Sequence, residues 1–276
     1  MSESTICRFT VPDGTQLAYH RQGTGPTVVL VHGGFVDHRA WSGLAALLAA
    51  SGYTVIAPDR RGHGLSDPYR SEHSVAADAS DLVEIIASVT QPGEKVRIVA
   101  HSSGGHSAIA AVNLSDSVSD LILYEPPRRR DEPPISGETW RRLDEAHAAN
   151  DRKRLVMIAL ADVVGKATGQ APPVPFPEPF WQAPFGQLLL ANALSIPTEL
   201  RANSEQDDSD DSLRDIHIPT WCVIGGNSPT YNRSFSDRLV AVNSSAQLIE
   251  LPGQDHGTPM TNPALVADVL NSLTAV

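Results

Sequence analysis

The chain is short of cysteine, of long apolar runs and of positive charge, and each shortage excludes a class of protein. Only two cysteines, Cys7 and Cys222, occur in 276 residues, so we expect neither a disulfide framework nor a cysteine-based metal site. No unbroken apolar run approaches the roughly 18 residues that a membrane-spanning helix needs. Residues 1–5 lack the basic patch and apolar run of a secretory leader. These absences predict a soluble, cytoplasmic protein.

The net charge of −11 argues against partners that are themselves anionic. Binding to nucleic acid or to anionic membranes depends on basic clusters. The one basic run, Arg128 to Arg130, is offset by the acidic stretch Asp207 to Asp211, and we expect both to be solvated loops. The expected partner is a small-molecule substrate, with no nucleic acid and no membrane. A homodimer is possible, because nothing in the sequence determines the oligomeric state.

The first half of the chain alternates strand and helix patterns. Ile6 to Val11 and Gln16 to Arg21 flank an Asp13-Gly14 turn, which predicts a hairpin. Thr27 to Val31 is a continuous apolar run of strand length, typical of a strand that is buried on both faces of a parallel sheet. Strand and helix patterns then alternate as far as Tyr124, so we expect an α/β fold with a mostly parallel, doubly wound sheet.

The alternation stops after Tyr124 and resumes with the apolar run Thr220 to Ile224. We therefore expect one core domain formed by residues 1–126 and 216–276, and an inserted cap at 127–215. Within the cap, the Pro-rich stretch Ala171 to Pro184 predicts irregular structure, because proline lacks an amide donor. Apolar cap residues could cover a hydrophobic ligand or form the core of the cap itself; they are Trp140, Met157, Phe176, Phe180, Trp181, Phe185 and Leu188 to Leu190.

A turn crowded with small residues, Ala100-His101-Ser102-Ser103-Gly104, connects a strand pattern to a helix pattern. It resembles the G-x-S-x-G nucleophile elbow of the α/β-hydrolase superfamily, with Ala100 in place of the first glycine. The resemblance implies that Ser102 is a nucleophile. The alternative is a serine-rich helix cap, since serine is a favoured N-cap residue.

The same resemblance implies a base and backbone donors for an oxyanion. His256 follows the last strand pattern, as the histidine of this superfamily does in the chain order Ser, acid, His. The amides of Ser103 and of Gly34, in His32-Gly33-Gly34-Phe35, would form the oxyanion hole, where glycine permits close approach of the backbone. The alternatives are an ordinary turn histidine and an ordinary Gly-rich turn. We expect His101 to point away from the elbow.

The turn Pro58 to Ser66 also resembles a turn of this superfamily. We expect it to be structural, so that it supports membership of the superfamily without supplying a further catalytic group.

The acid departs from the common pattern of this superfamily. The loop after the seventh strand usually carries aspartate, but here it reads Gly225-Gly226-Asn227-Ser228-Pro229, with Ser228 in that place. Glu125 ends the sixth strand pattern, from where a carboxylate can reach the same histidine. The zearalenone lactonases are similar in placing a glutamate there. The alternatives are that Glu125 is a solvated strand end, or that Asp255 turns back on its neighbour His256.

The whole chain is similar to α/β-hydrolases, with a helical cap inserted after strand 6. The resemblance implies a serine hydrolase that cleaves a carboxylic ester or lactone of a largely apolar molecule through Ser102, His256 and Glu125, without a metal or organic cofactor. Three alternatives stay open: a C–C hydrolase or lyase, a haloperoxidase-like enzyme, and a ligand-binding module like the hormone receptors of this superfamily.

Overall fold

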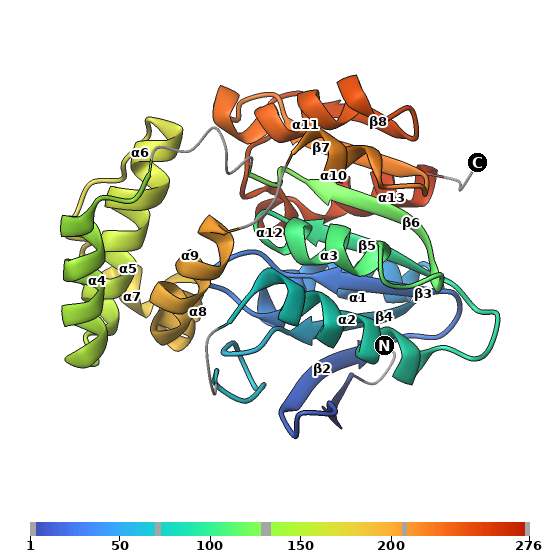
Figure 1. The fold of residues 1–276 in the computed structure, drawn as a ribbon, viewed down its shortest axis with the longest axis horizontal. Coiled ribbons are helices and arrows are strands. Elements are labelled where there is room, and N and C mark those ends of the chain that lie inside the picture. Colours follow the sequence, from blue (N-terminus) through green and yellow to red (C-terminus); the bar gives the residue numbers. More distant parts are fainter. Residues whose placement is uncertain (1–3, 70–72, 128–133, 206–208, 274–276) are drawn as a thin grey trace.

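The computed structural model describes residues 4–69, 73–127, 134–205 and 209–273. Within this part of the chain, eight strands form one sheet in the order β1-β2-β4-β3-β5-β6-β7-β8 (Figure 1). Strand β2 pairs antiparallel with both of its neighbours, and all other neighbours pair parallel. The predicted hairpin and the mostly parallel, doubly wound sheet are thus confirmed. The strands are β1 (Thr5–Thr10), β2 (Gln16–Gln22), β3 (Thr27–Val31), β4 (Thr54–Asp59), β5 (Val96–His101), β6 (Val118–Tyr124), β7 (Thr220–Gly225) and β8 (Ala246–Leu251).

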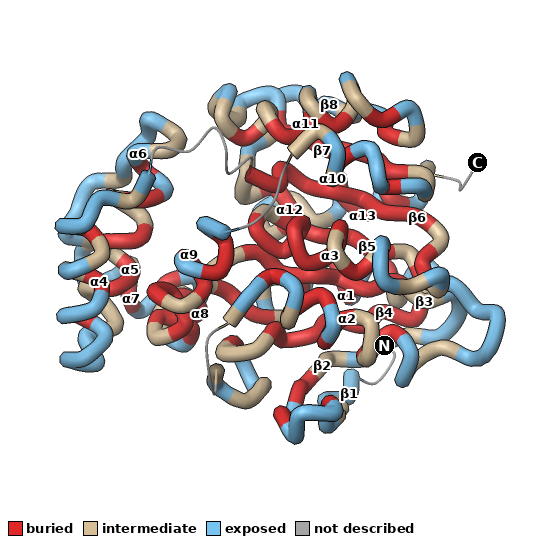
Figure 2. The backbone as a smooth tube through the Cα atoms, in the orientation of Figure 1, coloured by how far each residue is buried: buried red, intermediate tan, exposed pale blue. Residues whose placement is uncertain are grey.

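Alternate residues of the central strands belong to two separate hydrophobic cores, one on each face of the sheet. In β3, Val29 and Val31 belong to the first core, whereas Val28 and Leu30 belong to the second. Successive side chains of a strand point to opposite faces, so a strand that is buried on both faces must be apolar throughout. Figure 2 shows the result, with the central strands buried along most of their length.

Helices cover both faces of the sheet. One core packs under α2, α3, α10 and α11, and the other under η1, α1 and α13. Leu82, Ile85 and Ile86 give α2 one apolar face, which is buried in the first of these cores. The described helices of the sheet domain are η1 (His38–Trp41), α1 (Ser42–Ala50), α2 (Val75–Val89), α3 (Gly104–Val112), α10 (Asp210–Arg214), α11 (Thr230–Val242), α12 (Thr258–Thr261) and α13 (Pro263–Ser272).

The helices between Gly137 and Ser204 form a separate layer beside the end of the sheet (Figure 1). They enclose a third core that includes Trp181 and Leu189, so part of the apolar set predicted in the cap is its own interior. The next helix, α10, instead places Leu213 in the core of the sheet domain. The cap elements are α4 (Gly137–Ala148), α5 (Arg152–Ile158), the π-helix η3 (Ala159–Val164), α6 (Gly165–Thr168), α7 (Glu178–Gln182), α8 (Pro184–Asn192), η4 (Ala193–Ser195) and α9 (Ile196–Ser204).

The prediction of irregular structure throughout the Pro-rich stretch was wrong at the end of the stretch, where α7 lies and where α8 begins at Pro184. Helix α7, Glu178–Gln182, lies inside it and has Pro179 in its first turn. The first amides of a helix lack intrahelical acceptors, so proline costs nothing there and its fixed φ favours the helix. Before α7 the stretch has no helix or strand, as predicted.

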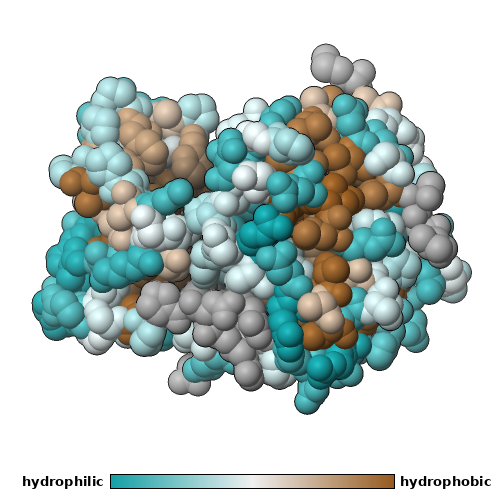
Figure 3. Space-filling model, turned by 90° about the horizontal axis from the view of Figure 1, so that it is seen from above, coloured by the Kyte–Doolittle hydropathy of each residue, from teal (hydrophilic) through white to brown (hydrophobic). Residues whose placement is uncertain are grey.

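The sheet ends at β8, which pairs on one side only. Seen from above, the surface carries an apolar area over the sheet domain (Figure 3), and Leu248 of β8 is 37% exposed.

The basic run Arg128 to Arg130 and the first acidic residues of Asp207 to Asp211 lie outside the described residues. Among the helices that are described, none combines the length and the apolar character needed to cross a membrane.

Helix α3 packs unusually close to the end of β3. A Cβ atom on Gly104 would lie 2.3 Å from the carbonyl oxygen of His32 and 3.0 Å from that of Val31. Both are backbone atoms and cannot move aside as the end of a side chain can. Glycine at this position therefore sets how closely the helix after the elbow approaches the sheet.

We predict that Gly104→Ala lowers the free energy of unfolding by about 2 kcal/mol, the usual scale of overpacking. The matched control is Gly137→Ala in the first turn of α4, because a Cβ atom there would meet no atom within 4 Å. The control should be neutral or stabilising by up to about 1 kcal/mol, since alanine favours helix. Urea unfolding of both variants measures the difference, and equal effects would contradict this account of Gly104.

Candidate active site

Ser102 stands at a sharp corner between β5 and α3. Its φ is +52°, in the left-handed region that residues with a Cβ rarely adopt. Two hydrogen bonds hold the corner: the Ser102 amide donates to the Tyr124 carbonyl at 2.9 Å, and the Gly105 amide donates to the Ser102 carbonyl at 2.8 Å. The structure thus gives the predicted elbow segment a strained strand-to-helix turn.

Glu125 lies at the end of β6, buried to 1% exposure. Its Oε2 is 2.7 Å from Nδ1 of His256, and its Oε1 accepts from the Gly225 amide at 2.7 Å. The structure therefore brings Glu125 and His256 together across 131 positions of sequence. Because Glu125 is buried and bonded, it does not behave as a solvated strand end.

The environment of Glu125 favours its ionised form. Burial works to raise the pKa of this carboxyl, but the hydrogen bond and charge of His256 and the amide of Gly225 outweigh it, so the net pKa is lowered. Ser228 contributes in the same direction, although its buried hydroxyl makes no hydrogen bond of ordinary geometry. The carboxylate of Glu125 is thus available to His256, although the loop after β7 has Ser228 in place of an aspartate.

Asn232 of α11 is a member of this group that the sequence did not reveal. Its Nδ2 donates to Glu125 Oε2 at 3.0 Å and lies 2.9 Å from His256 Nδ1. Two donors cannot bond to each other, so the amide and the ring N–H both point to the one carboxylate oxygen. Asn232 thereby fixes the carboxylate that orients the histidine.

The loop that carries His256 is fastened to the ends of two strands. The Tyr124 hydroxyl donates to the Asp255 carbonyl at 2.8 Å, and His101 Nε2 lies 3.0 Å from the His256 carbonyl. The rings of His101 and His256 are 4.5 Å apart between centroids. Burial, followed by the nearby His256, holds the pKa of His101 well below its usual value, so this ring is neutral. His101 packs on the His256 loop.

Asp255 takes a local role. Its Oδ1 accepts from the Gly257 amide at 2.9 Å, which closes the turn around His256. The contact to the His256 ring comes from Glu125 instead.

Residues with left-handed backbone are concentrated just beyond the carboxyl ends of β3, β5 and β6. In the described part of the chain, four non-glycine residues have positive φ, and three of them are Phe35, Ser102 and Glu125. Each costs on the order of 1 to 2 kcal/mol relative to ordinary backbone. Strained backbone of this kind tends to cluster at functional sites, where surrounding contacts hold it.

The two residues predicted to supply the oxyanion-hole amides lie close together. A Cβ atom on Gly34 would be 3.3 Å from the Ser103 hydroxyl, a tighter contact than most side chains make, so glycine gives the two segments room to approach. The neighbouring amide of Phe35 is already used, because it donates to Glu199 Oε2 at 3.2 Å. Among the described residues, neither the Gly34 amide nor the Ser103 amide donates to another protein group.

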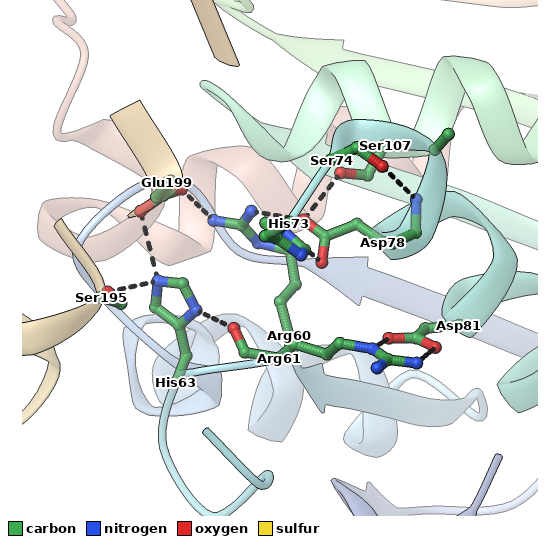
Figure 4. Close-up of polar contacts among 12 residues, drawn as sticks. Arg60, Arg61, His63, His73, Ser74, Asp78, Asp81, Ser107, Ser195 and Glu199 are labelled. Carbon is green, nitrogen blue, oxygen red and sulfur yellow. Dashed lines mark hydrogen bonds and ion pairs between the residues drawn. The ribbon is translucent and has the colours of Figure 1, made fainter. Parts of the chain in front are cut away.

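A buried ion-pair network lies directly behind this loop, built around Arg60 (Figure 4). Arg60 bonds Asp78 at 2.9 Å and also bonds Glu199 of the cap, while His63 Nε2 lies 3.2 Å from Glu199. Burial lowers the pKa of Arg60, but Glu199 and Asp78 more than compensate and raise it. The turn Pro58 to Ser66, expected to be structural, therefore supplies two charged or polar groups close to the site.

One group of side chains in the described residues has the spacing of metal ligands: Asp37, His38 and Asp59. These groups already satisfy one another and their neighbours. Asp59 Oδ1 lies 2.8 Å from His38 Nδ1, and Asp37 is bonded by Arg39 and by Asn192. We therefore interpret the cluster as a structural network that joins the sheet domain to α8 of the cap.

Comparison with known proteins agrees with this architecture. A family model described as the alpha/beta hydrolase family matches residues 28–269. A non-heme haloperoxidase of Rhodococcus erythropolis is 27% identical over 277 residues, an alignment that covers 95% of this chain and 97% of that protein. The solved structure of an alpha/beta hydrolase from Sphaerobacter thermophilus superposes with a TM-score of 0.80 at 28% identity, covering 96% and 98% of the two chains. The expected fold class is confirmed.

A more similar but shorter match is an uncharacterized protein of Mycobacterium bovis. It is 38% identical over 117 residues, which are 42% of this chain and 33% of that protein. The chain thus aligns with only a third of the length of this relative.

The buried carboxylates of the Arg60 network should make the protein acid-sensitive. Asp78 has a pKa lowered from 3.8 to about 2, because Arg60 and His73 outweigh its burial. Its stabilising contribution is therefore full above about pH 4 and is lost as the pH falls toward 2. We predict that Asp78→Asn has a lower free energy of unfolding than the parent at pH 7. The difference between the two free energies should narrow by about 2 kcal/mol on acidification.

Urea unfolding of parent and variant between pH 7 and pH 2.5 measures that gap. The control is Glu178→Gln, an exposed cap carboxylate paired with Lys153, which should run parallel to the parent. A gap for Asp78→Asn that does not change with pH would contradict the linkage.

Proposed function

The chain belongs to the alpha/beta hydrolase family, and we propose that it is a serine hydrolase that cleaves a carboxylic ester or lactone of a small to medium, largely apolar molecule. The observation that carries the proposal is the 2.7 Å contact between His256 and the buried Glu125, together with the left-handed corner at Ser102, whose neighbour His101 has its ring 4.5 Å from that of His256. A base that is oriented by an anion, next to a strained serine, is the arrangement that nucleophilic acyl transfer needs.

In the proposed mechanism, Ser102 Oγ bonds to the carbonyl carbon of the substrate as His256 takes the hydroxyl proton. Glu125 holds His256 Nδ1–H and balances the charge of the imidazolium. The oxyanion is stabilised by the amides of Gly34 and Ser103. Collapse of the tetrahedral intermediate releases the alcohol, which receives the proton from His256. Water then attacks the acyl-enzyme by the same route and frees the acid.

The proposal of an apolar substrate comes from the cap. Several aromatic and aliphatic side chains of the cap, together with Phe35, are only partly buried and pack against the cap core; the cap members are Trp140, Met157, Phe176, Phe180 and Leu190. Phe35 belongs to the segment that follows β3, so this apolar surface extends to the predicted oxyanion loop. Ligand pockets are lined mostly by such side chains.

A haloperoxidase-like activity is the second candidate, because the haloperoxidase of Rhodococcus erythropolis aligns with nearly the whole chain. Both activities would use the same serine. A halogenation assay run beside the ester panel separates them, and substrates with scissile C–C bonds cover the remaining enzymatic alternative.

We predict that Ser102→Ala reduces turnover of any ester or lactone substrate by about 10³-fold or more, with substrate affinity largely kept, because the nucleophile acts in the chemical step. The measurement is an ester and lactone panel, including macrocyclic lactones, with parent and variant side by side. Labelling by a fluorophosphonate should be rapid in the parent and absent in the variant. Residual activity within tenfold of the parent would refute the serine-hydrolase proposal, and slow labelling of the parent would favour a binding module.

We further predict that Glu125→Gln lowers kcat by roughly 10³- to 10⁴-fold, since glutamine keeps the size but removes the charge and favours the wrong histidine tautomer. Ser228→Ala and Asp255→Asn serve as controls and should each cost far less. Thermal unfolding must show that Glu125→Gln is folded. A folded and active Glu125→Gln enzyme would mean that the site works as a serine–histidine dyad.

A further inference from the structure

A carboxylate of the cap is buried against the loop that we propose as an oxyanion hole. Glu199 lies on α9, is 1% exposed, and has no role in the reaction proposed above. Its burial would raise its pKa, but Arg60 and His63 outweigh that effect and hold the pKa well below the usual value. Glu199 is therefore ionised. Its hydrogen bonds and ion pairs with other described side chains and amides go to the sheet domain.

Among the described residues, Glu199 has four partners, and they come from three separate segments of the sheet domain. Oε2 accepts from the Phe35 amide at 3.2 Å and lies 3.2 Å from His63 Nε2. Oε1 accepts from the Ser103 hydroxyl at 3.2 Å and from Arg60. Figure 4 shows Glu199 reaching from the cap toward Arg60 and His63. One side chain thus ties the loop after β3, the turn after β4 and the elbow together.

The loop after β3 is held on both sides of Gly34. On one side, Arg60 Nη2 donates to the Gly33 carbonyl at 3.1 Å. In a planar trans peptide the carbonyl and the next N–H point in opposite directions, so this bond directs the Gly34 N–H away from Arg60. On the other side, Glu199 holds the amide of Phe35, whose φ of +66° needs such support.

Glu199 also reaches the residue that carries the second amide of the proposed hole. Its bond to the Ser103 hydroxyl fixes the residue whose backbone N–H follows the nucleophile. A Cβ atom on Gly34 would lie 3.4 Å from Glu199 Oε1 and 3.3 Å from the Ser103 hydroxyl. Both donor segments therefore rest on the same carboxylate.

We propose that Glu199 is a positioning residue for the oxyanion hole, so that the cap supplies part of the catalytic geometry as well as a cover for the substrate. The inference rests on the proposed function. A carboxylate this close to a developing oxyanion would oppose catalysis if its charge were unpaired. Arg60 offsets that charge, since its guanidinium lies between Glu199 and Asp78.

The test compares Glu199→Gln with a control that loosens the cap elsewhere. Asn192 is equally buried, and its side chain joins α8 to Gly64 and to Asp37, two residues beyond Phe35, but it makes no hydrogen bond to Gly34, Phe35 or Ser103. We expect Glu199→Gln to lower kcat by roughly 10- to 100-fold with KM within about threefold, the scale of a misplaced oxyanion donor. Asn192→Ala should lower the melting temperature and leave kcat within about threefold.

Hydrogen exchange of the peptide that contains Phe35 gives a readout that does not depend on activity. Exchange of this amide should accelerate in Glu199→Gln and more strongly in Glu199→Ala, while Asn192→Ala leaves it unchanged. If Glu199→Ala does not fold, Glu199→Gln decides alone. A kcat within threefold of the parent, or an equal loss of kcat in Asn192→Ala, would overturn the inference.

Failure of the proposed function has a different signature. In that case turnover by the parent would not depend on Ser102, whereas exchange at Phe35 would still show whether Glu199 holds the loop. Unchanged exchange in Glu199→Gln would overturn the positioning role whatever reaction the protein catalyses.

Discussion

The candidate site depends on backbone that is held in the left-handed region at neighbouring strand ends. Parallel strands end at one edge of the sheet, so the segments after β3, β5 and β6 meet there. Phe35, Ser102 and Glu125 each adopt positive φ, which no local preference of these residue types favours. The packing of two cores against the sheet supplies the free energy that holds these corners.

Much of this arrangement was accessible from the sequence, and the reasons are local. The alternating strand and helix patterns predicted the sheet, and the small residues around Ser102 predicted the corner, because both signals lie within a few consecutive residues. Glu125 was predicted as the acid because it ends the sixth strand pattern along the chain, from where a carboxylate can reach His256. The structure adds that it is buried and 2.7 Å from His256.

The members that the sequence did not reveal are those placed by tertiary packing. Asn232 lies in the first turns of α11 with no motif around it, and its contact with Glu125 exists only because α11 packs beside β7. Glu199 comes from an insertion whose internal pattern gives no hint of which side chain turns toward the sheet domain. His101 could be assigned to the elbow but not to the His256 loop, since that contact spans 155 positions.

The position of the acid bears on how such chains are recognised. Strand ends β6 and β7 are neighbours, so a carboxylate from either can occupy the same space beside His256. A comparison by alignment column finds Ser228 at the place where the superfamily pattern has an aspartate. A comparison by proximity in space finds a buried carboxylate on the histidine ring. Under the proposed function, a survey of such chains should therefore search for a carboxylate at the carboxyl ends of β6 and β7, because these strands are neighbours and either end can supply the acid.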